Sequence, residues 1–87
     1  MSAQPPIFRA DIERNSREEV RVTLEAYHGR FILDVRVWED MKFGAVSSRG
    51  PTRKGATIDA CRIPEMIAAL EGAQVEAVRL GLVEADQ

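Results

Sequence analysis

VRVTLEAYHGRFILDVRVW, residues 20–38, decides the fold, because apolar and polar residues alternate through it on both sides of one glycine turn. The runs 20–24 and 31–38 have the two-residue period of strands that bury one face. His28 and Gly29 lie between them, and glycine in the second loop position lets the chain reverse with positive φ at little cost. The stretch therefore predicts a β-hairpin with His28-Gly29 at its tip.

The position of this turn also predicts the register of the hairpin. Pairing Tyr27 with Arg30 sorts the side chains into two faces. The apolar face contains Val20, Val22, Leu24, Ala26, Phe31, Leu33, Val35 and Val37, and the opposite face, the polar face, contains Arg21, Thr23, Glu25, Tyr27, Arg30, Ile32, Asp34, Arg36 and Trp38. A slip of one residue in either strand would mix these two sets, so the pattern itself supports the register.

Two arginines face each other on the polar face. In the predicted register Arg21 lies directly opposite Arg36, and like charges in that position destabilise a sheet unless something neutralises them. Glu25 and Asp34 are nearby carboxylates on the same face, and a bound phosphate would serve equally well.

The flanking sequence extends the hairpin into a small α+β domain. A weak alternation predicts a strand over Ile7 to Glu13, ended by a turn at Asn15 and Ser16. The pattern dissolves over residues 39–49, which we interpret as a loop or a distorted strand. Pro51 suits the start or edge of a further short strand over residues 56–59.

The remainder is predicted to be one helix that begins at Pro64 and ends near Gly81. Its apolar stripe is broad for one four-stranded sheet to cover, so part of it is expected to bury against a second subunit. The expected dimer contacts are Ile67, Leu70, Val75 and Val78. Glu65, Ala68, Gly72, Glu76 and Arg79 form the solvated side.

Length and composition limit the class of protein. A chain of 87 residues is one domain at most and is marginally stable alone, so oligomerisation would help it. No apolar run approaches the roughly 20 residues of a membrane span, and the N-terminus lacks a signal-peptide pattern. One cysteine, Cys61, excludes an internal disulfide. We expect a cytoplasmic protein without membrane association, with tails at 1–6 and 83–87 around a domain at 7–82.

Charge and chemistry argue against an enzyme. Residues 1–62 carry a net +2 and residues 63–87 a net −4, which indicates segregated basic and acidic surfaces. One histidine and one cysteine are too few for a metal site or a Cys/His pair, so we predict no catalytic residues, no metal and no cofactor. Aromatic rings and cations on the polar face instead suit stacking bases and phosphates. The residues alone leave open nucleic-acid binding, an oligomeric interaction domain and, less favoured, an enzyme.

The order of pieces resembles a known family. The chain has a strand leading into Tyr27-His28-Gly29-Arg30, then LDVRVW, then PTRKG at residues 51–55, and then a proline-initiated helix. This order resembles the single-stranded-DNA-binding domain of the transcriptional coactivator positive cofactor four and its short bacterial and phage versions. The likeness spans roughly Ile7 to Leu80. It implies a strongly curved four-stranded antiparallel sheet followed by one C-terminal helix, assembled as a homodimer with channels for single strands.

The resemblance also implies roles for individual residues. Tyr27 matches an aromatic that stacks on a base, and Arg30 matches a phosphate contact. His28 stands where lysine is common; a mostly neutral imidazole would make that contact weaker or pH-dependent. The other contacts that the resemblance implies are Arg36, Arg53 and Lys54, and Trp38, although the family's stacking tryptophan can lie one residue further along, where this chain has Glu39. Arg21 is a further candidate contact because it is a cation on the same polar face.

The sequence thus leads us to expect a homodimeric, non-enzymatic protein that binds single-stranded DNA with little sequence preference. It would act in transcription like a coactivator, or as an accessory factor in replication, recombination or repair, with contacts to that machinery; in a bacterium it would be nucleoid-associated. Two alternatives stay open: a protein–protein interaction module and an RNA-binding variant of the same fold.

Overall fold

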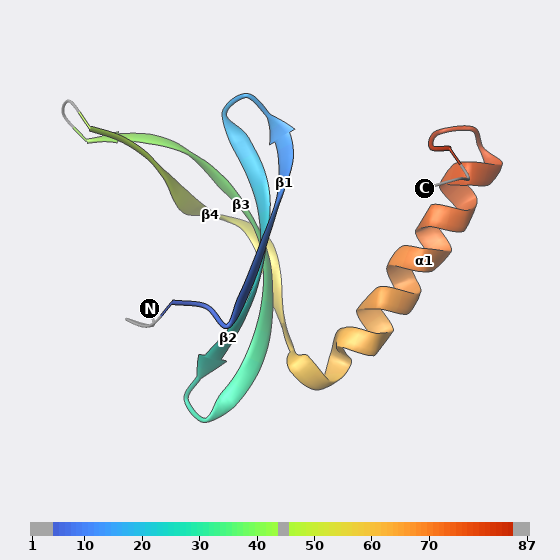
Figure 1. Ribbon diagram of the computed structural model, residues 1–87, viewed down its shortest axis with the longest axis horizontal. Helices are drawn as coiled ribbons and strands as arrows, with labels where there is room; N and C mark the ends of the chain where they lie inside the picture. The colour runs from blue at the N-terminus through green and yellow to red at the C-terminus, as the bar shows by residue number, and fades with distance from the viewer. Residues whose placement is uncertain (1–4, 44–45, 85–87) are drawn as a thin grey trace.

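The computed structural model describes residues 5–43 and 46–84. Four strands, a 3-10 turn and one helix follow each other along the chain (Figure 1): β1 (Phe8–Asn15), β2 (Glu18–Tyr27), β3 (Arg30–Phe43), β4 (Val46–Asp59), η1 (Ala60–Arg62) and α1 (Ile63–Arg79). The strands form one antiparallel sheet in the order β1-β2-β3-β4, and β3 and β4 bend strongly along their length. The predicted sheet and C-terminal helix are confirmed.

The predicted hairpin register is also confirmed. Tyr27 pairs with Arg30, Arg21 with Arg36, and Val20 with Val37. The neighbouring strands continue the two faces. Phe8, Ala10 and Ile12 of β1 and Ala56 and Ile58 of β4 pair with residues of the apolar face, whereas Arg9 and Asp11 of β1 and Thr57 and Asp59 of β4 pair with residues of the polar face. Glu19, which pairs with Glu13 and with Trp38, extends the polar face by one residue.

The strands are longer than the sequence pattern indicated. Residues 39–43 continue β3, and β4 begins at Val46, so the interpretation of 39–49 as a loop was wrong and its alternative, a distorted strand, holds. Asp40 pairs with Arg49, and Glu39 pairs with Gly50. Backbone pairing and this cross-strand ion pair hold the segment in a strand although its hydrophobic alternation is lost. Gly44 and Ala45 lie outside the described residues.

A β-bulge interrupts the pairing of β3 with β4. Arg36 pairs with Gly55 on one side of it and Trp38 with Pro51 on the other. Val37 therefore lies opposite three residues of β4, Thr52, Arg53 and Lys54. Proline donates no backbone hydrogen bond, so Pro51 suits this break in the ladder. Bulges bend a strand and increase its twist, and this one lies within the bent part of β4.

Helix α1 has Pro64 in its first turn, as predicted, and ends at Arg79; Leu80 is its C-cap, and Gly81 after it has φ of 77°. It extends away from the sheet (Figure 1) and packs against η1, and none of its residues is buried. No helix among the described residues is long and apolar enough to cross a membrane.

Neither apolar surface is covered within one chain. Leu33 and Val37 are the buried hydrophobic residues of the described chain, each 9% exposed. Phe8, Ile12 and Phe31 on the apolar face are more than half exposed. The aliphatic face expected to form a core is therefore open, because α1 does not lie on it. Of the predicted tails, residues 1–4 and 85–87 lie outside the described residues, and the boundaries of the domain at 7–82 stay a prediction.

Candidate nucleic-acid interface

The tip of the β2–β3 hairpin places two rings at the surface. Tyr27 is 49% exposed, and its ring lies edge-on to that of His28, with centroids 4.2 Å apart and planes at 77°. His28 and Gly29 both have positive φ, 49° and 77°, which is the pattern of a type I′ turn. The tight turn therefore fixes Tyr27 on the polar face, where its ring is not needed for the core.

Arg30 follows the turn and forms an exposed ion pair. Its Nη2 donates to both carboxylate oxygens of Asp59, at 2.8 and 2.7 Å, and its side chain is 67% exposed. A pair this exposed contributes little free energy, so a phosphate oxygen can replace the carboxylate at small cost. Arg30 stays a candidate phosphate contact.

The polar face is balanced in charge, which the sequence did not reveal. Each arginine on it has a nitrogen between 2.7 and 3.0 Å from a carboxylate oxygen: Arg9 with Asp11, Arg21 with Glu19, Arg30 with Asp59, Arg36 with Asp34 and Arg49 with Glu19. All five arginines therefore pair with carboxylates of the described residues, and they differ in exposure, from 11% for the Arg21 side chain to 67% for that of Arg30. The basic residues predicted to gather here do so, but not as a field of unpaired cations.

Arg21 and Arg36 are neutralised separately. Asp34 neutralises Arg36, which is one of the alternatives that the sequence predicted. Glu25, the other predicted carboxylate, accepts a hydrogen bond from Thr23 and does not pair with Arg21. Arg21 donates to Glu19 at 2.8 Å and lies 3.6 Å from Asp11. The like-charge pair thus needs no bound phosphate to be stable.

Trp38 is partly covered by one of these arginines. The guanidinium carbon of Arg21 lies 3.6 Å from the centroid of the tryptophan ring, a cation–π contact. The Arg21 side chain is only 11% exposed, and its Nε also lies 2.8 Å from Oε2 of Glu19. One face of the Trp38 ring is therefore occupied by Arg21, so any base would have to stack on the other.

Arg49 and Glu19 form a cluster that the sequence reading missed. Arg49 donates to Asp40 at 2.9 Å, to Glu19 at 2.9 Å and to the Ser16 carbonyl oxygen at 3.2 Å. It thereby ties β4 to the β1–β2 turn. Hydrogen bonds from Arg21 and Arg49 hold the pKa of Glu19 below its ordinary value, and Glu19 is 7% exposed. Reading 39–49 as a strand would have paired Asp40 with Arg49 and pointed to this cluster.

Arg53 and Lys54 lie in the bulge of β4 and are exposed. Within residues 5–43 and 46–84, neither side chain makes an ion pair. They differ in this from the arginines of the polar face. The structure thus separates the predicted cations into a paired group on the strands and an exposed pair in the bulge.

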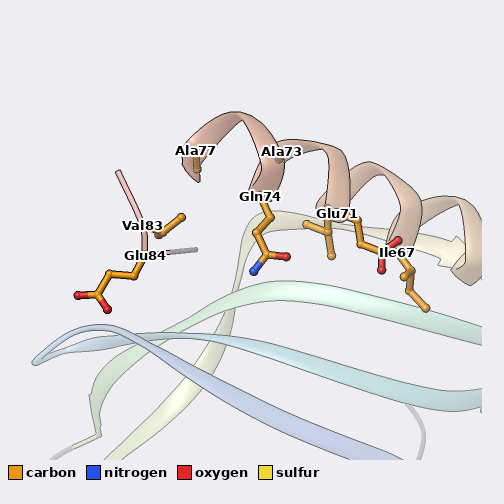
Figure 2. A pocket seen from close by; sticks show the side chains of 8 residues that line it. Ile67, Glu71, Ala73, Gln74, Ala77, Val83 and Glu84 are labelled. Atoms are coloured by element: carbon orange, nitrogen blue, oxygen red, sulfur yellow. The ribbon is translucent and has the colours of Figure 1, made fainter. Parts of the chain in front are cut away.

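The predicted dimer contacts lie on α1. Ile67, Leu70 and Val75 are 50%, 61% and 66% exposed, and Val78 is half-buried. A groove of about 550 Å³ runs along the helix (Figure 2), lined by Ile67, Leu70, Ala73, Ala77 and Val83 together with Glu71, Gln74 and Glu84. Two of the four predicted contacts, Ile67 and Leu70, therefore line one apolar surface.

The residues that could hold a metal are not assembled. Among the described residues, no group of three or more histidine, cysteine, aspartate or glutamate side chains has the arrangement of a metal site. Cys61 is exposed, next to Arg30 and Asp59 at the edge of a shallow pocket.

A bent four-stranded antiparallel sheet followed by one helix, with an aromatic turn and a basic bulge, is a fold like that of positive cofactor four (PC4), as the sequence resemblance implied. The particular match is BPSL1147, a PC4 homolog from Burkholderia pseudomallei. Its tetragonal crystal form aligns with a TM-score of 0.66 and 28% sequence identity, covering 75% of this chain and 91% of that chain. Its orthorhombic form aligns with a TM-score of 0.67 and 27% identity, covering 80% and 88%.

No family model matches this sequence, and no curated protein matches it significantly. The structural match to a PC4 homolog agrees with the resemblance seen in the sequence, and it extends over most of both chains.

Proposed function

We propose that this protein binds single-stranded DNA with low sequence specificity and works as a homodimer. The observation that carries the proposal is the fold: the chain matches a PC4 homolog over three quarters of its length at 28% identity. The proposed role is that of a coactivator-like regulator of transcription or an accessory factor in replication, recombination or repair, because each of these exposes single strands.

The chemistry of the surface supports this proposal. Tyr27 offers an exposed ring, and stacking of a base on an aromatic ring contributes roughly 1 to 3 kcal/mol. Arg53 and Lys54 offer exposed cations, and Arg30 can exchange Asp59 for a phosphate. Base stacking and phosphate contacts carry no readout of base edges, so binding through them is expected to show little sequence preference.

The open apolar surfaces support the homodimer. The apolar face of the sheet and the apolar side of α1 are both uncovered in one chain, although together they contain most of its large hydrophobic residues. A chain of this size is marginally stable even with a closed core. A second copy that brings its own sheet and helix would cover both surfaces at once.

The proposal is tested by fluorescence anisotropy with a labelled oligo-dT of about 20 nucleotides, titrated at several salt concentrations. Affinity should fall with salt, with a slope of about 0.7 for each phosphate contacted, and should be higher for the single strand than for a duplex. Equal binding to both would contradict the proposal. Competition with a matched RNA distinguishes DNA binding from RNA binding.

Tyr27→Ala serves as the variant of the binding site. It should weaken binding by about tenfold or more, the loss expected for one stacked base. Ala68→Ser, on the predicted solvated side of α1, is the control and should bind DNA normally. If the protein is a protein-interaction module, the wild type and both variants should fail to bind the oligonucleotide.

A further inference from the structure

The bulge of β4 is held in place by a side chain from the neighbouring strand. We propose that Arg36 is a positioning residue, which fixes the bulge so that Arg53 and Lys54 are presented to the DNA backbone, and that it does not itself contact a phosphate. This inference rests on the proposed function and assigns to Arg36 a different role from the phosphate contact that the family resemblance implies.

All three nitrogens of the Arg36 guanidinium are engaged. Nε donates to both oxygens of Asp34 at 3.2 Å, and Nη2 donates to Oδ1 of Asp34 at 3.0 Å. Nη1 donates to the carbonyl oxygen of Thr52 at 2.9 Å. The planar guanidinium thus bridges a carboxylate on its own strand and the backbone of the bulge, an arrangement that the point charge of lysine could not reproduce.

Thr52 connects the Arg36 hydrogen bond to the rest of the bulge through its own hydroxyl group. Its hydroxyl donates to the carbonyl oxygen of Val37 at 2.8 Å and accepts from the backbone N–H of Lys54 at 3.1 Å. These contacts replace the ladder hydrogen bonds that the extra residues interrupt. Thr52 is therefore held at its carbonyl by Arg36 and at its hydroxyl by Val37, and Lys54 is held through Thr52.

Gly55 closes the bulge on its other side. A Cβ at this position would lie 2.5 Å from the carbonyl oxygen of Val35 and 2.7 Å from the Cα of Arg36. The backbone of β4 returns to the ladder in close contact with the residue that anchors the bulge. Arg36 thus contacts the bulge at two points: its side chain binds Thr52, and its backbone lies against Gly55.

Charge and exposure separate the two groups of cations. The Arg36 and Asp34 side chains are 23% and 14% exposed, so their pairing is partly shielded from water and salt. For Arg36 to contact a phosphate through the nitrogens now engaged, it would have to leave Asp34 or release Thr52, and an unpaired, partly buried Asp34 is costly. Arg53 and Lys54 are exposed and can meet a phosphate without such a loss.

A double-mutant cycle tests the proposal, with oligo-dT affinity and its salt slope as readouts. Arg53→Ala/Lys54→Ala should lower the slope by about 1.4, or 0.7 for each phosphate contact. Arg36→Gln in the wild-type chain should weaken binding by about three- to tenfold. In the Arg53→Ala/Lys54→Ala background, Arg36→Gln should change neither quantity, since no presented cation remains. A further loss of about 0.7 in slope there would overturn the proposal.

Thr52→Val is a second variant that changes no charge. It removes the hydroxyl that joins Val37 to Lys54 and should weaken binding in the wild-type chain but not in the Arg53→Ala/Lys54→Ala background. Equal weakening in both backgrounds, or none in either, would contradict the relay. Circular dichroism verifies that each variant is folded, and hydrogen exchange should show faster exchange of the Lys54 amide in Arg36→Gln and Thr52→Val.

Asp34→Asn distinguishes the two roles of Arg36, because only one of them predicts tighter binding. If Arg36 contacts phosphate, removal of its carboxylate partner frees the cation, and affinity and salt slope should both rise. If Arg36 positions the bulge, neither should rise above those of the control Glu25→Gln, which removes one charge from the same face. Wild-type protein that fails to bind single strands overturns the proposed function itself, whereas normal wild-type binding with an additive cycle overturns only the role of Arg36.

Discussion

At the scale of single residues, the surroundings of Gly55 and Gly72 and the backbone conformation of His28 determine which substitutions the fold tolerates. Gly55 lies against the backbone of β3, whereas Gly72 lies on α1 with nothing within 4 Å of where a Cβ would be. His28 occupies the left-handed region of φ, which residues with a Cβ adopt less readily than glycine. These positions therefore differ in how much a substitution should cost.

Gly55→Ala should destabilise the protein by about 1 to 3 kcal/mol, since its methyl group would lie 2.5 Å from a carbonyl oxygen that belongs to the backbone and cannot move aside. Urea unfolding at one fixed protein concentration measures the change. Gly72→Ala is the control, and it should be neutral or stabilise by up to about 1 kcal/mol, since alanine favours the helix. Equal stability of the two variants would show that the close approach at Gly55 is absent.

His28→Lys should strengthen binding to oligo-dT and raise the salt slope by about 0.7, because it places a permanent cation at the exposed tip of the hairpin. His28→Gln, which is neutral and of similar size, is the control and should leave the slope unchanged. An unchanged slope in His28→Lys would show that the DNA backbone does not pass the turn.

At the scale of elements, ion pairs rather than apolar packing join the ends of the strands. Arg49 connects β4 with β3 through Asp40 and with β2 through Glu19, and it also holds the β1–β2 turn through the Ser16 carbonyl oxygen. The hydrophobic alternation is lost in this part of the sheet. A charged cluster therefore joins β3 and β4 to the first two strands beside the β1–β2 turn.

This cluster should make the protein sensitive to acid. The pKa of Glu19 is lowered by hydrogen bonds from Arg21 and Arg49, and that of Asp11 by a hydrogen bond from Arg9. A carboxyl whose folded pKa is lowered stabilises the fold above its unfolded pKa, and this contribution is lost as pH falls through the folded value. For Glu19 the loss should begin below its ordinary value of 4.5.

Urea unfolding at pH 7 and between pH 5 and 3 measures this effect. Glu19→Gln should be less stable than the wild type at pH 7, and its stability should fall less steeply below pH 4.5, because one of the linked protons is gone. Glu65→Gln, an exposed residue of α1, is the control and should follow the wild-type pH dependence. A Glu19→Gln profile parallel to that of the wild type would contradict the linkage.

At the scale of the whole molecule, a single chain leaves its apolar surfaces open. The sheet and α1 lie apart (Figure 1), and of the side chains on the apolar face only Leu33 and Val37 are buried, whereas Phe8, Ile12 and Phe31 are more than half exposed. Large hydrophobic side chains are exposed on both the apolar face and α1, among them Phe8, Ile12, Phe31, Ile67, Leu70 and Val75. Exposed apolar patches of this kind mark interaction sites. Assembly is thus expected to decide the stability of this protein as well as its binding surface.

Leu70→Glu should disrupt the proposed homodimer, because it places a charge among the apolar side chains of the groove on α1. Sedimentation equilibrium should show a dimer for the wild type and a monomer, or a marked loss of folded structure, for the variant. Ala68→Glu, on the predicted solvated side of the same helix, is the control and should remain dimeric. A wild-type chain that is monomeric and fully folded would contradict the assembly.

The sequence by itself determined the hairpin, its register, its two faces and the helix, since each follows from local periodicity and from one glycine turn. It also predicted the cations and aromatics of the candidate site, because residue type and spacing suffice for that. Only the tertiary structure decided which of those cations are paired, since Asp34, Asp59 and Glu19 reach their arginines through side-chain conformation and strand pairing. The bulge at Thr52 to Lys54 likewise depends on contacts between β3 and β4, which no local pattern specifies.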